Sequence, residues 1–417
     1  MRDFDLARIK SRHEMIRYFD GWSAERKEEL AEKKTRKPLV KTNLLETLGC
    51  AGNHGDDVVK LFARNGMILK ELEKDLYQSV VEGRTIGFLE RLRPRIVALY
   101  STMDSRELEA LVRRLVMTAP EIDHVWLSGS TFNVLWNLVC KVSNPNRYVR
   151  IVFMHDSIYD VDNPSVSPPD IRDSSTDDDD ILGDDLRVVI ERRAARFQLV
   201  DRVRVVKEKL GDLQKTYSPL HAISQLRFPS SVGKGGHDFC DNGKVTNRSD
   251  SFRDHRSHIL YVTRIYEKML GETEERVWSG SEVSTGLPNE FQRILGVPLV
   301  ARFSEPLTQA VFEYWLNSTF RRPQNRFRLW GHPITLGPTK AHVYGLDKHL
   351  WRPLFLEITA QGCTAVVPRG TCGNTVHRLV TNIQRYLDPA AEFYLGQVPY
   401  SMIVDSSSQE VPYDLSK

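Results

Sequence analysis

The clearest pattern of apolar and polar positions lies within residues 93–160, where short apolar runs alternate with longer amphipathic segments. The apolar runs have the length of buried strands, and the amphipathic segments have the 3.6-residue spacing of helices. The predicted elements, in order, are a strand at 95–100, a helix at 105–117, a strand at 124–128, a helix at 130–142 and a strand at 148–154. Because short helical crossovers normally join parallel strands, this order predicts a Rossmann-like parallel βαβαβ unit over 93–160.

Helical patterns precede this unit, and a mixture of helical and strand patterns follows it. Residues 1–92 contain charged stretches rich in helix formers, which predict an N-terminal helical segment. Residues 183–417 combine helical spacing with short apolar runs, which predict a second α/β or α+β domain. The expected fold class is therefore α/β.

The segment at 161–182 has a different composition, dominated by Pro, Ser and Asp, and is expected to be an acidic linker or surface loop. Residues 161–185 hold nine Asp and one Arg, a charge of −8, so that the rest of the chain carries +3 − (−8) = +11. This excess favours a polyanionic partner, either a nucleotide or nucleic acid. In the alternative interpretation, Lys and Arg only solvate the surface. The acidic segment and the charged helix within 1–40 are the expected docking sites for protein partners.

The cysteines are scattered and form no CxxC pair, which argues against a disulfide framework or a zinc knuckle. No apolar stretch approaches the roughly 18 residues that cross a bilayer, and the first residues lack the apolar core of a signal peptide. We therefore expect a soluble, cytoplasmic protein without membrane contacts.

A histidine-rich and aspartate-rich stretch at 235–258 is the first candidate site. Asp241-Asn242-Gly243 predicts a hairpin turn, with His237 on the strand before it. A helix capped by Ser249 or Asp250 is expected to follow.

On that helix Asp250, Asp254 and His258 are four residues apart, so they share one face, with His255 alongside. Together with His237 they are the candidate catalytic residues. They supply the chemistry of a divalent metal site or an acid/base pair. Two alternatives stay open, namely structural ion pairs with neighbouring arginines and contacts of those arginines with phosphate or nucleic acid.

Two glycine-containing turns before helices are the candidate phosphate-binding sites, because backbone N–H groups at a helix start attract anions. Their residues are Arg369, Gly370, Thr371, Gly373, Asn374 and Thr375 in one turn, and Ser128, Gly129, Ser130 and Thr131 in the other. Helix capping explains both turns equally well. Cys372, beside the first helix start, has the position of a nucleophile with a lowered pKa.

Together these features predict that the chain binds a phosphate-bearing ligand, either a nucleotide or nucleic acid. If the chain is an enzyme, the expected reaction is hydrolysis or transfer at phosphorus. The alternative is a non-catalytic sensor or scaffold subunit of a multiprotein assembly. No cofactor is specified beyond a divalent metal, and the sequence leaves the choice between enzyme and scaffold open.

Overall fold

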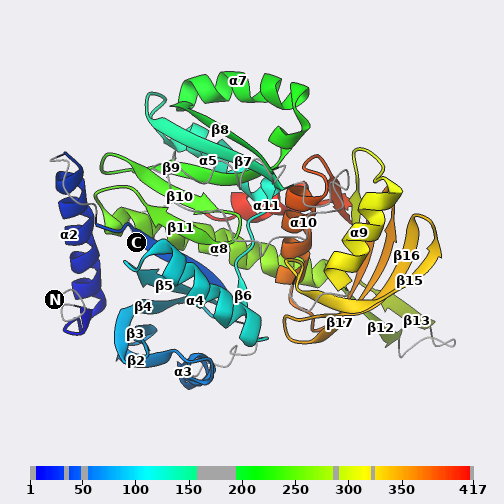
Figure 1. Ribbon diagram of the computed structural model, residues 1–417, viewed down its shortest axis with the longest axis horizontal. Helices are drawn as coiled ribbons and strands as arrows, with labels where there is room; N and C mark the ends of the chain where they lie inside the picture. Colours follow the sequence, from blue (N-terminus) through cyan, green and yellow to red (C-terminus); the bar gives the residue numbers. More distant parts are fainter. Residues whose placement is uncertain are drawn as a thin grey trace.

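Two antiparallel sheets dominate the computed structural model, which describes residues 6–31, 37–47, 55–156, 194–284, 291–320 and 325–413. Figure 1 shows the larger sheet and its helices on one side and the smaller sheet on the other. The predicted acidic segment at 161–182 lies outside the described residues.

The first sheet has the strand order β2-β3-β4-β5-β1-β11-β10-β9-β7-β8, with β6 paired to the end of β1. Its strands are β1 (Val40–Thr47), β2 (Ile68–Glu73), β3 (Leu76–Val81), β4 (Arg84–Arg93), β5 (Ile96–Ser101), β6 (Ile122–His124), β7 (Tyr148–Asp156), β8 (Ala194–Arg202), β9 (Ile223–Pro229), β10 (Gly236–Cys240) and β11 (Lys244–Asn247). All eight residues of β1 are buried, which is typical of a strand covered on both faces.

Helices accompany this sheet. They are α2 (Arg12–Ala31), α3 (Gly55–Arg64), α4 (Ser105–Thr118), α5 (Gly129–Val142), α7 (Val203–Thr216), the 3₁₀ helix η1 (Ser218–His221) and α8 (Phe252–Val277). In α4 the buried residues are the five that the spacing predicts, namely Leu108, Leu111, Val112, Leu115 and Val116. Asp104 accepts a hydrogen bond from the backbone N–H of Arg106 and so begins this helix.

The second sheet has the order β15-β16-β17-β18-β14-β19-β20. The strands of this part of the chain are β12 (Trp278–Ser284), β13 (Phe291–Leu295), β14 (Leu299–Arg302), β15 (Leu329–Gly337), β16 (Lys340–Asp347), β17 (Arg352–Thr359), β18 (Gly362–Pro368), β19 (Glu392–Leu395) and β20 (Val398–Pro399). Its helices are α9 (Gln309–Phe320), α10 (Asn374–Tyr386) and α11 (Tyr400–Gln409). Every residue of α10 is buried, and α11 packs back onto α5 and α8 of the first unit.

Helix α8 joins the two parts of the molecule, since it follows β11 of the first sheet and leads directly into β12 of the second (Figure 1). Its 26 residues span about 39 Å at 1.5 Å per residue. One large apolar core includes residues of both sheets and of α8. A smaller core fills the space among β2–β5, α3 and α4. The two sheets therefore share an interior.

The predicted Rossmann-like parallel unit is wrong. Strands β5 and β6 both pair antiparallel with β1, and β7 pairs antiparallel with β8 and β9. The order of strands and helices over 96–156 matches the expectation, although the strand expected at 124–128 lies at 122–124. However, β1 lies between β5 and β6, which a parallel crossover would have made neighbours. In the described residues the single parallel pairing is the short one between β12 and β18.

Two helical predictions also differ from the structure. Residues 68–93 form a three-stranded meander, because their β-branched and aromatic residues pack against α3 and β5. The apolar spacing over 183–217 predicts a helix there as well, but residues 194–202 form β8 and the helix begins only at Val203. Among the described helices, none is long and apolar enough to cross a membrane.

Candidate functional site

The predicted hairpin forms and places His237 in the interior. Strands β10 and β11 pair antiparallel, with His237 opposite Asn247. Gly243 makes the turn with a φ of +73°, and a Cβ there would lie 2.7 Å from the carbonyl oxygen of Val125. The turn therefore requires glycine for both its conformation and its close packing.

The start of α8 brings the second half of the site to the first. Ser251 caps the helix by accepting the backbone N–H of Asp254, and Asp20 of α2 accepts the N–H groups of Phe252 and Arg253. This anchoring turns Asp254, His255 and His258 into the protein, where all three are buried.

We call His237, Asp254, His255 and His258 the histidine cluster. The Nε2 atom of His237 lies 2.8 Å from Oδ2 of Asp254, and Nδ1 of His258 lies 3.6 Å from Oδ1 of the same carboxylate. The Nδ1 atoms of His237 and His255 are 3.3 Å apart. Metal-ligating atoms of His237, Asp254 and His258 all lie within 4.8 Å of one another.

Burial sets the charge states of this cluster. It lowers the pKa of His258 to about 4 and the pKa of His255 well below its usual range, and the charge of His237 adds to both effects. Burial alone would raise the pKa of Asp254, but the hydrogen bond from His237 and the nearby imidazoles lower it. At neutral pH the cluster thus offers an ionised Asp254 carboxylate and the neutral imidazoles of His255 and His258, the forms that ligate metals.

Neighbouring groups hold these side chains in place. Asp254 also accepts hydrogen bonds from the hydroxyl of Ser230, at 2.7 Å, and from the backbone N–H of Ser231, at 3.0 Å. The hydroxyl of Thr42 lies 2.9 Å from Nε2 of His255, and that of Tyr413 lies 3.5 Å from Nε2 of His258. Such an arrangement can hold a metal ion or pass a proton along its hydrogen bonds.

Asp250 does not join the cluster. It pairs with Lys27 at 2.5 Å near the surface. Beside this pair is a small cavity of about 30 Å³, room for about two waters. Its lining residues are Trp22, Ser23, Arg26, Lys27, Leu39, Val40, Asn247, Arg248 and Ser249. Asn247 connects the cavity to the cluster, since its Oδ1 lies 3.2 Å from Nδ1 of His237.

Groups of the protein itself accept the hydrogen bonds that the predicted phosphate loop at 369–375 would offer to an anion. The backbone N–H of Gly373 donates to a carboxylate oxygen of Glu274 at 2.8 Å, so this carboxylate lies where an anion would bind. Thr375 donates to Asp347, and the side-chain amide of Asn374 donates to the carbonyl of His124. Arg369 is exposed, next to Gly370, whereas Thr371 is buried.

The polar groups of the second predicted phosphate loop, at 128–131, also bond to other groups of the protein. Ser128 caps α5 by accepting the N–H of Thr131, and the N–H of Gly129 donates to the side-chain oxygen of Gln384 at 3.0 Å. A Cβ on Gly129 would lie 3.1 Å from Cα of Ala222, so the backbone is closely packed here. Ser130 is half-buried.

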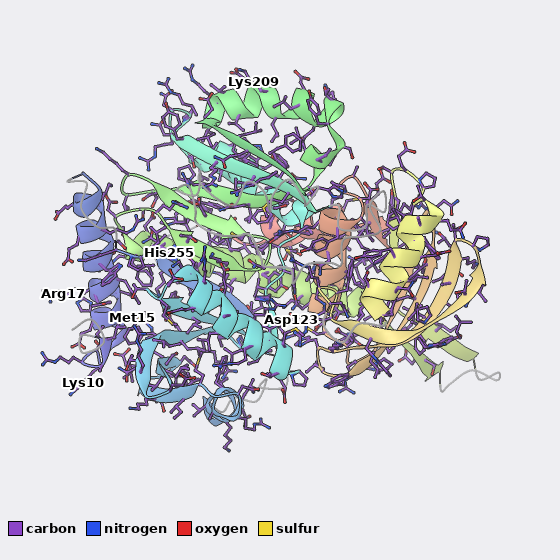
Figure 2. The ribbon with its side chains drawn as sticks, viewed as in Figure 1. Lys10, Met15, Arg17, Asp123, Lys209 and His255 are labelled. Carbon is purple, nitrogen blue, oxygen red and sulfur yellow. The ribbon has the colours of Figure 1, made fainter. Side chains whose placement is uncertain are left out.

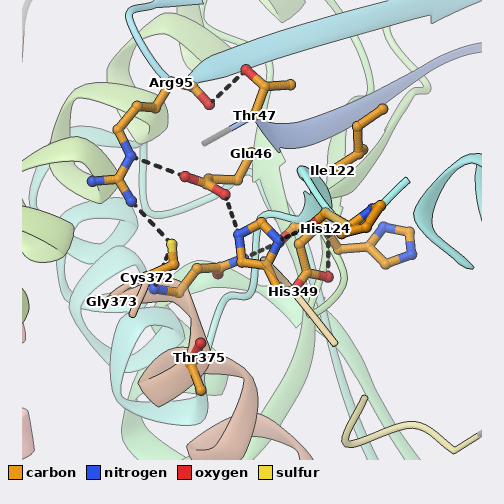
Figure 3. Close-up of polar contacts among 12 residues, drawn as sticks. Glu46, Thr47, Arg95, Ile122, His124, His349, Cys372, Gly373 and Thr375 are labelled. Carbon is orange, nitrogen blue, oxygen red and sulfur yellow. Dashed lines mark hydrogen bonds and ion pairs between the residues drawn. The ribbon is translucent and has the colours of Figure 1, made fainter. Parts of the chain in front are cut away.

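A second buried cluster, which the sequence did not indicate, lies where the two sheets meet (Figure 3). We call it the junction cluster. His349 and Glu46 are in contact at 2.8 Å, and Arg95 donates to Glu46, Glu274 and the sulfur of Cys372. Burial raises the pKa of Cys372 well above its usual range, and the negative charge of Glu46 raises it further. This thiol is therefore not poised as a nucleophile.

Arg378 completes the junction cluster. Its guanidinium is fully buried and pairs with Asp123 of β6 and Asp347 of β16, one from each sheet. Arg328 also pairs with Asp123, at 3.1 Å.

The two clusters are far apart. Asp254 and Glu274 lie on the same helix, twenty positions apart along the sequence, which is about 30 Å. Figure 2 places His255 and Asp123, one from each cluster, in separate parts of the interior. The stretch 235–258 and the loop 369–375 therefore do not form one active site.

Comparison with known proteins assigns the chain to a family. The model of the MJECL33-like protein family matches residues 4–400. The chain belongs to this family. It is also similar to "Uncharacterized protein MJECL33" of Methanocaldococcus jannaschii, with 20% identity over 371 residues, which are 84% of this chain and 85% of the relative. No solved structure matches the chain.

Proposed function

We propose that this chain binds a divalent transition-metal ion through His237, Asp254 and His258 and acts on a phosphate-bearing ligand, by hydrolysis or transfer at phosphorus. One observation carries the proposal: the ligating atoms of these three buried residues lie within 4.8 Å of one another, and among the described residues no guanidinium contacts the Asp254 carboxylate. Two imidazoles and a carboxylate form the protein ligand set of several zinc hydrolases and of non-haem iron enzymes.

The small cavity beside the cluster supports an anionic ligand. Arg26, Lys27 and Arg248 line it, and Asn247 links it to His237. The cavity has room for only about two waters, and Lys27 and Arg248 already pair with Asp250 and Asp238, so a phosphate group would contact these cations from outside the cavity. Guanidinium groups match phosphate oxygens well. Zinc or manganese at the cluster would polarise a phosphoryl oxygen or activate a water.

Thermal unfolding with Zn²⁺, Mn²⁺ and Fe²⁺ tests the metal site. An ion at 100 times its Kd stabilises the folded protein by about 2.7 kcal/mol, so it raises the Tm of the wild type. We expect D254N to lose this response and D250N, which alters a nearby carboxylate outside the cluster, to keep it. A wild type that responds to no ion, or a D254N protein that responds fully, contradicts the proposal.

Hydrolysis of p-nitrophenyl phosphate tests the reaction class separately. We expect metal-dependent turnover that disappears in D254N. If the protein binds metal but shows no turnover, and inorganic phosphate does not compete, then the metal site stands and the proposed reaction at phosphorus is wrong.

A cytoplasmic location, expected from the scattered cysteines, belongs to the same proposal. Among the described residues, Cys140, Cys363 and Cys372 carry free thiols. Recovery of the protein in the cytosolic fraction of cells tests this location.

A second candidate, the scaffold function, is favoured by an exposed face of the second sheet. Trp330, Tyr344 and Phe355 stand on three adjacent strands, and their exposed fractions are 51%, 61% and 39%. Ile334 and Val366 extend this apolar surface. Contiguous exposed apolar side chains mark protein-binding surfaces.

For this second candidate we expect a second copy of the chain as the partner. Sedimentation velocity should then show a concentration-dependent dimer for the wild type and a monomer for the W330S/Y344S variant. A wild type that stays monomeric at high concentration rejects this candidate.

A further inference from the structure

A large groove lies between α5 and α7, away from both clusters. Its volume is about 490 Å³, within the usual range of ligand-binding pockets. The lining residues are Asn133, Trp136, Asn137, Cys140, Lys141, Lys207, Leu210, Gly211 and Gln214. It shares no residue with the histidine cluster or the small cavity.

Helical spacing builds the groove from two facing rows. On α5 the residues Asn133, Asn137 and Lys141 follow one another at intervals of four, and on α7 Lys207 and Gly211 do the same. These residues are exposed and form the rim. Trp136 and Leu210 are buried and form an apolar floor. An apolar floor with a few polar groups at the rim is typical of small-molecule sites.

Gly211 is the least expected residue in this region. Glycine in the middle of a helix is unfavourable relative to alanine. No atom lies within 4 Å of a Cβ built at this position, so packing does not require glycine here. The missing side chain instead leaves the wall of the groove open.

The groove is also positively charged. Lys141 and Lys207 line it, and no Asp or Glu belongs to the lining. Among the described residues neither lysine forms an ion pair with a carboxylate. The floor includes the half-buried thiol of Cys140, whose pKa is raised by burial and partly lowered again by Lys207. Two unpaired ammonium groups above an apolar floor favour an anion that carries a hydrophobic part.

We propose that the groove between α5 and α7 binds a small organic anion. Its carboxylate or phosphate group lies between Lys141 and Lys207, its apolar or planar part rests on Trp136 and Leu210, and the amides of Asn133 and Asn137 orient it. This site is independent of the proposed metal centre, so either can fail without the other.

Fluorescence titration with 2-naphthoate and 2-naphthyl phosphate tests the proposal, with neutral 2-naphthamide as the comparison ligand. We expect the wild type to bind at least one anion at least tenfold more tightly than the amide, and the stronger one identifies the anionic group. K207Q should weaken binding about tenfold. K209Q is the matched control, because Lys209 lies on the outer side of α7 (Figure 2), and it should leave the affinity unchanged.

G211A separates binding from folding. The added methyl group should raise the Tm, because alanine favours a helix and meets no neighbour, and it should weaken anion binding by narrowing the groove. The proposal is overturned if neither anion binds the wild type at millimolar concentration, or if K207Q and K209Q bind equally well.

Discussion

The histidine cluster and the junction cluster are both buried, yet their electrostatics are opposite. Around Asp254 the neighbouring imidazoles of His255 and His258 are kept neutral, and the carboxylate takes its hydrogen bonds from hydroxyl, backbone and imidazole groups. At the junction, carboxylates alternate with permanent cations. Glu46, Glu274, Asp123 and Asp347 contact the guanidinium groups of Arg95, Arg328 and Arg378 and the imidazole of His349.

This difference separates a candidate metal site from a structural one. Glu46, His349 and Cys372 also offer ligating atoms within 4.8 Å of one another. There, however, the guanidinium of Arg95 contacts both Glu46 and Cys372 and already supplies the positive charge that a metal would bring. Near the histidine cluster no guanidinium contacts Asp254 among the described residues. Proximity of donors is therefore not enough to indicate a metal centre.

The largest effect should come from removing the central cation of the junction. R378M leaves Asp123 and Asp347 buried without their shared partner, and losing one member of a buried pair costs about 3–5 kcal/mol. Urea unfolding should show this loss while metal affinity is unchanged. K215M, which removes an exposed pair with Asp212, is the control and should change stability little. A small loss in R378M would mean that the junction does not hold the sheets together.

An intermediate effect is expected at the histidine cluster. D254N keeps the shape of the side chain but removes its charge, so it weakens the charge-assisted bonds from Ser230, Ser231 and His237 by about 1.5–3 kcal/mol in total. Unlike R378M, this variant should also abolish metal uptake. If R378M and D254N both lower stability and neither changes metal binding, then the histidine cluster is structural, like the junction cluster.

The junction should give the protein a pH-dependent stability at neutral pH. Burial alone would lower the pKa of His349, but Glu46, Asp123 and Asp347 raise it above its usual range. A raised pKa means that the folded state holds the proton more tightly, so this contribution is complete below about pH 6.5 and is lost as pH rises through the raised pKa. Unfolding experiments on wild type and H349Q across this range should show the extra decline in the wild type. Parallel curves would contradict the assignment.

The smallest effect is expected at Asp250. Its bond to Lys27 is partly exposed, so D250N should cost at most about 1 kcal/mol and leave metal binding intact. This variant tests whether the cluster ends at Asp254. A loss of metal binding in D250N would extend the site to the surface.

The sequence predicted individual elements better than their arrangement. Periodicity located α4 and α5, and the turn at Gly243 located the β10–β11 hairpin. The polar residues before α8 predicted its start to within two residues of the cap, Ser251. Four-residue spacing correctly placed Asp254 and His258 on one helical face. These features are local, so short-range chemistry determines them.

The arrangement of the sheets depended on contacts between distant segments. Short helical crossovers predict a parallel sheet, but β1 lies between β5 and β6 and pairs antiparallel with both. β1 has no strong alternation of apolar and polar residues, because both of its faces are buried. The junction cluster joins Glu46 to His349, 303 residues apart. The expected anion sites lay at helix starts, but Gln384 and Glu274 bond to their backbone N–H groups from other elements. No local pattern reveals such partners.

Anomalous diffraction from crystals grown with Zn²⁺ tests the central claim most directly. We expect one strong peak within bonding distance, about 2.0–2.2 Å, of ligating atoms of His237, Asp254 and His258, and none beside Cys372. A peak among Glu46, His349 and Cys372, or no peak at the histidine cluster, would contradict it.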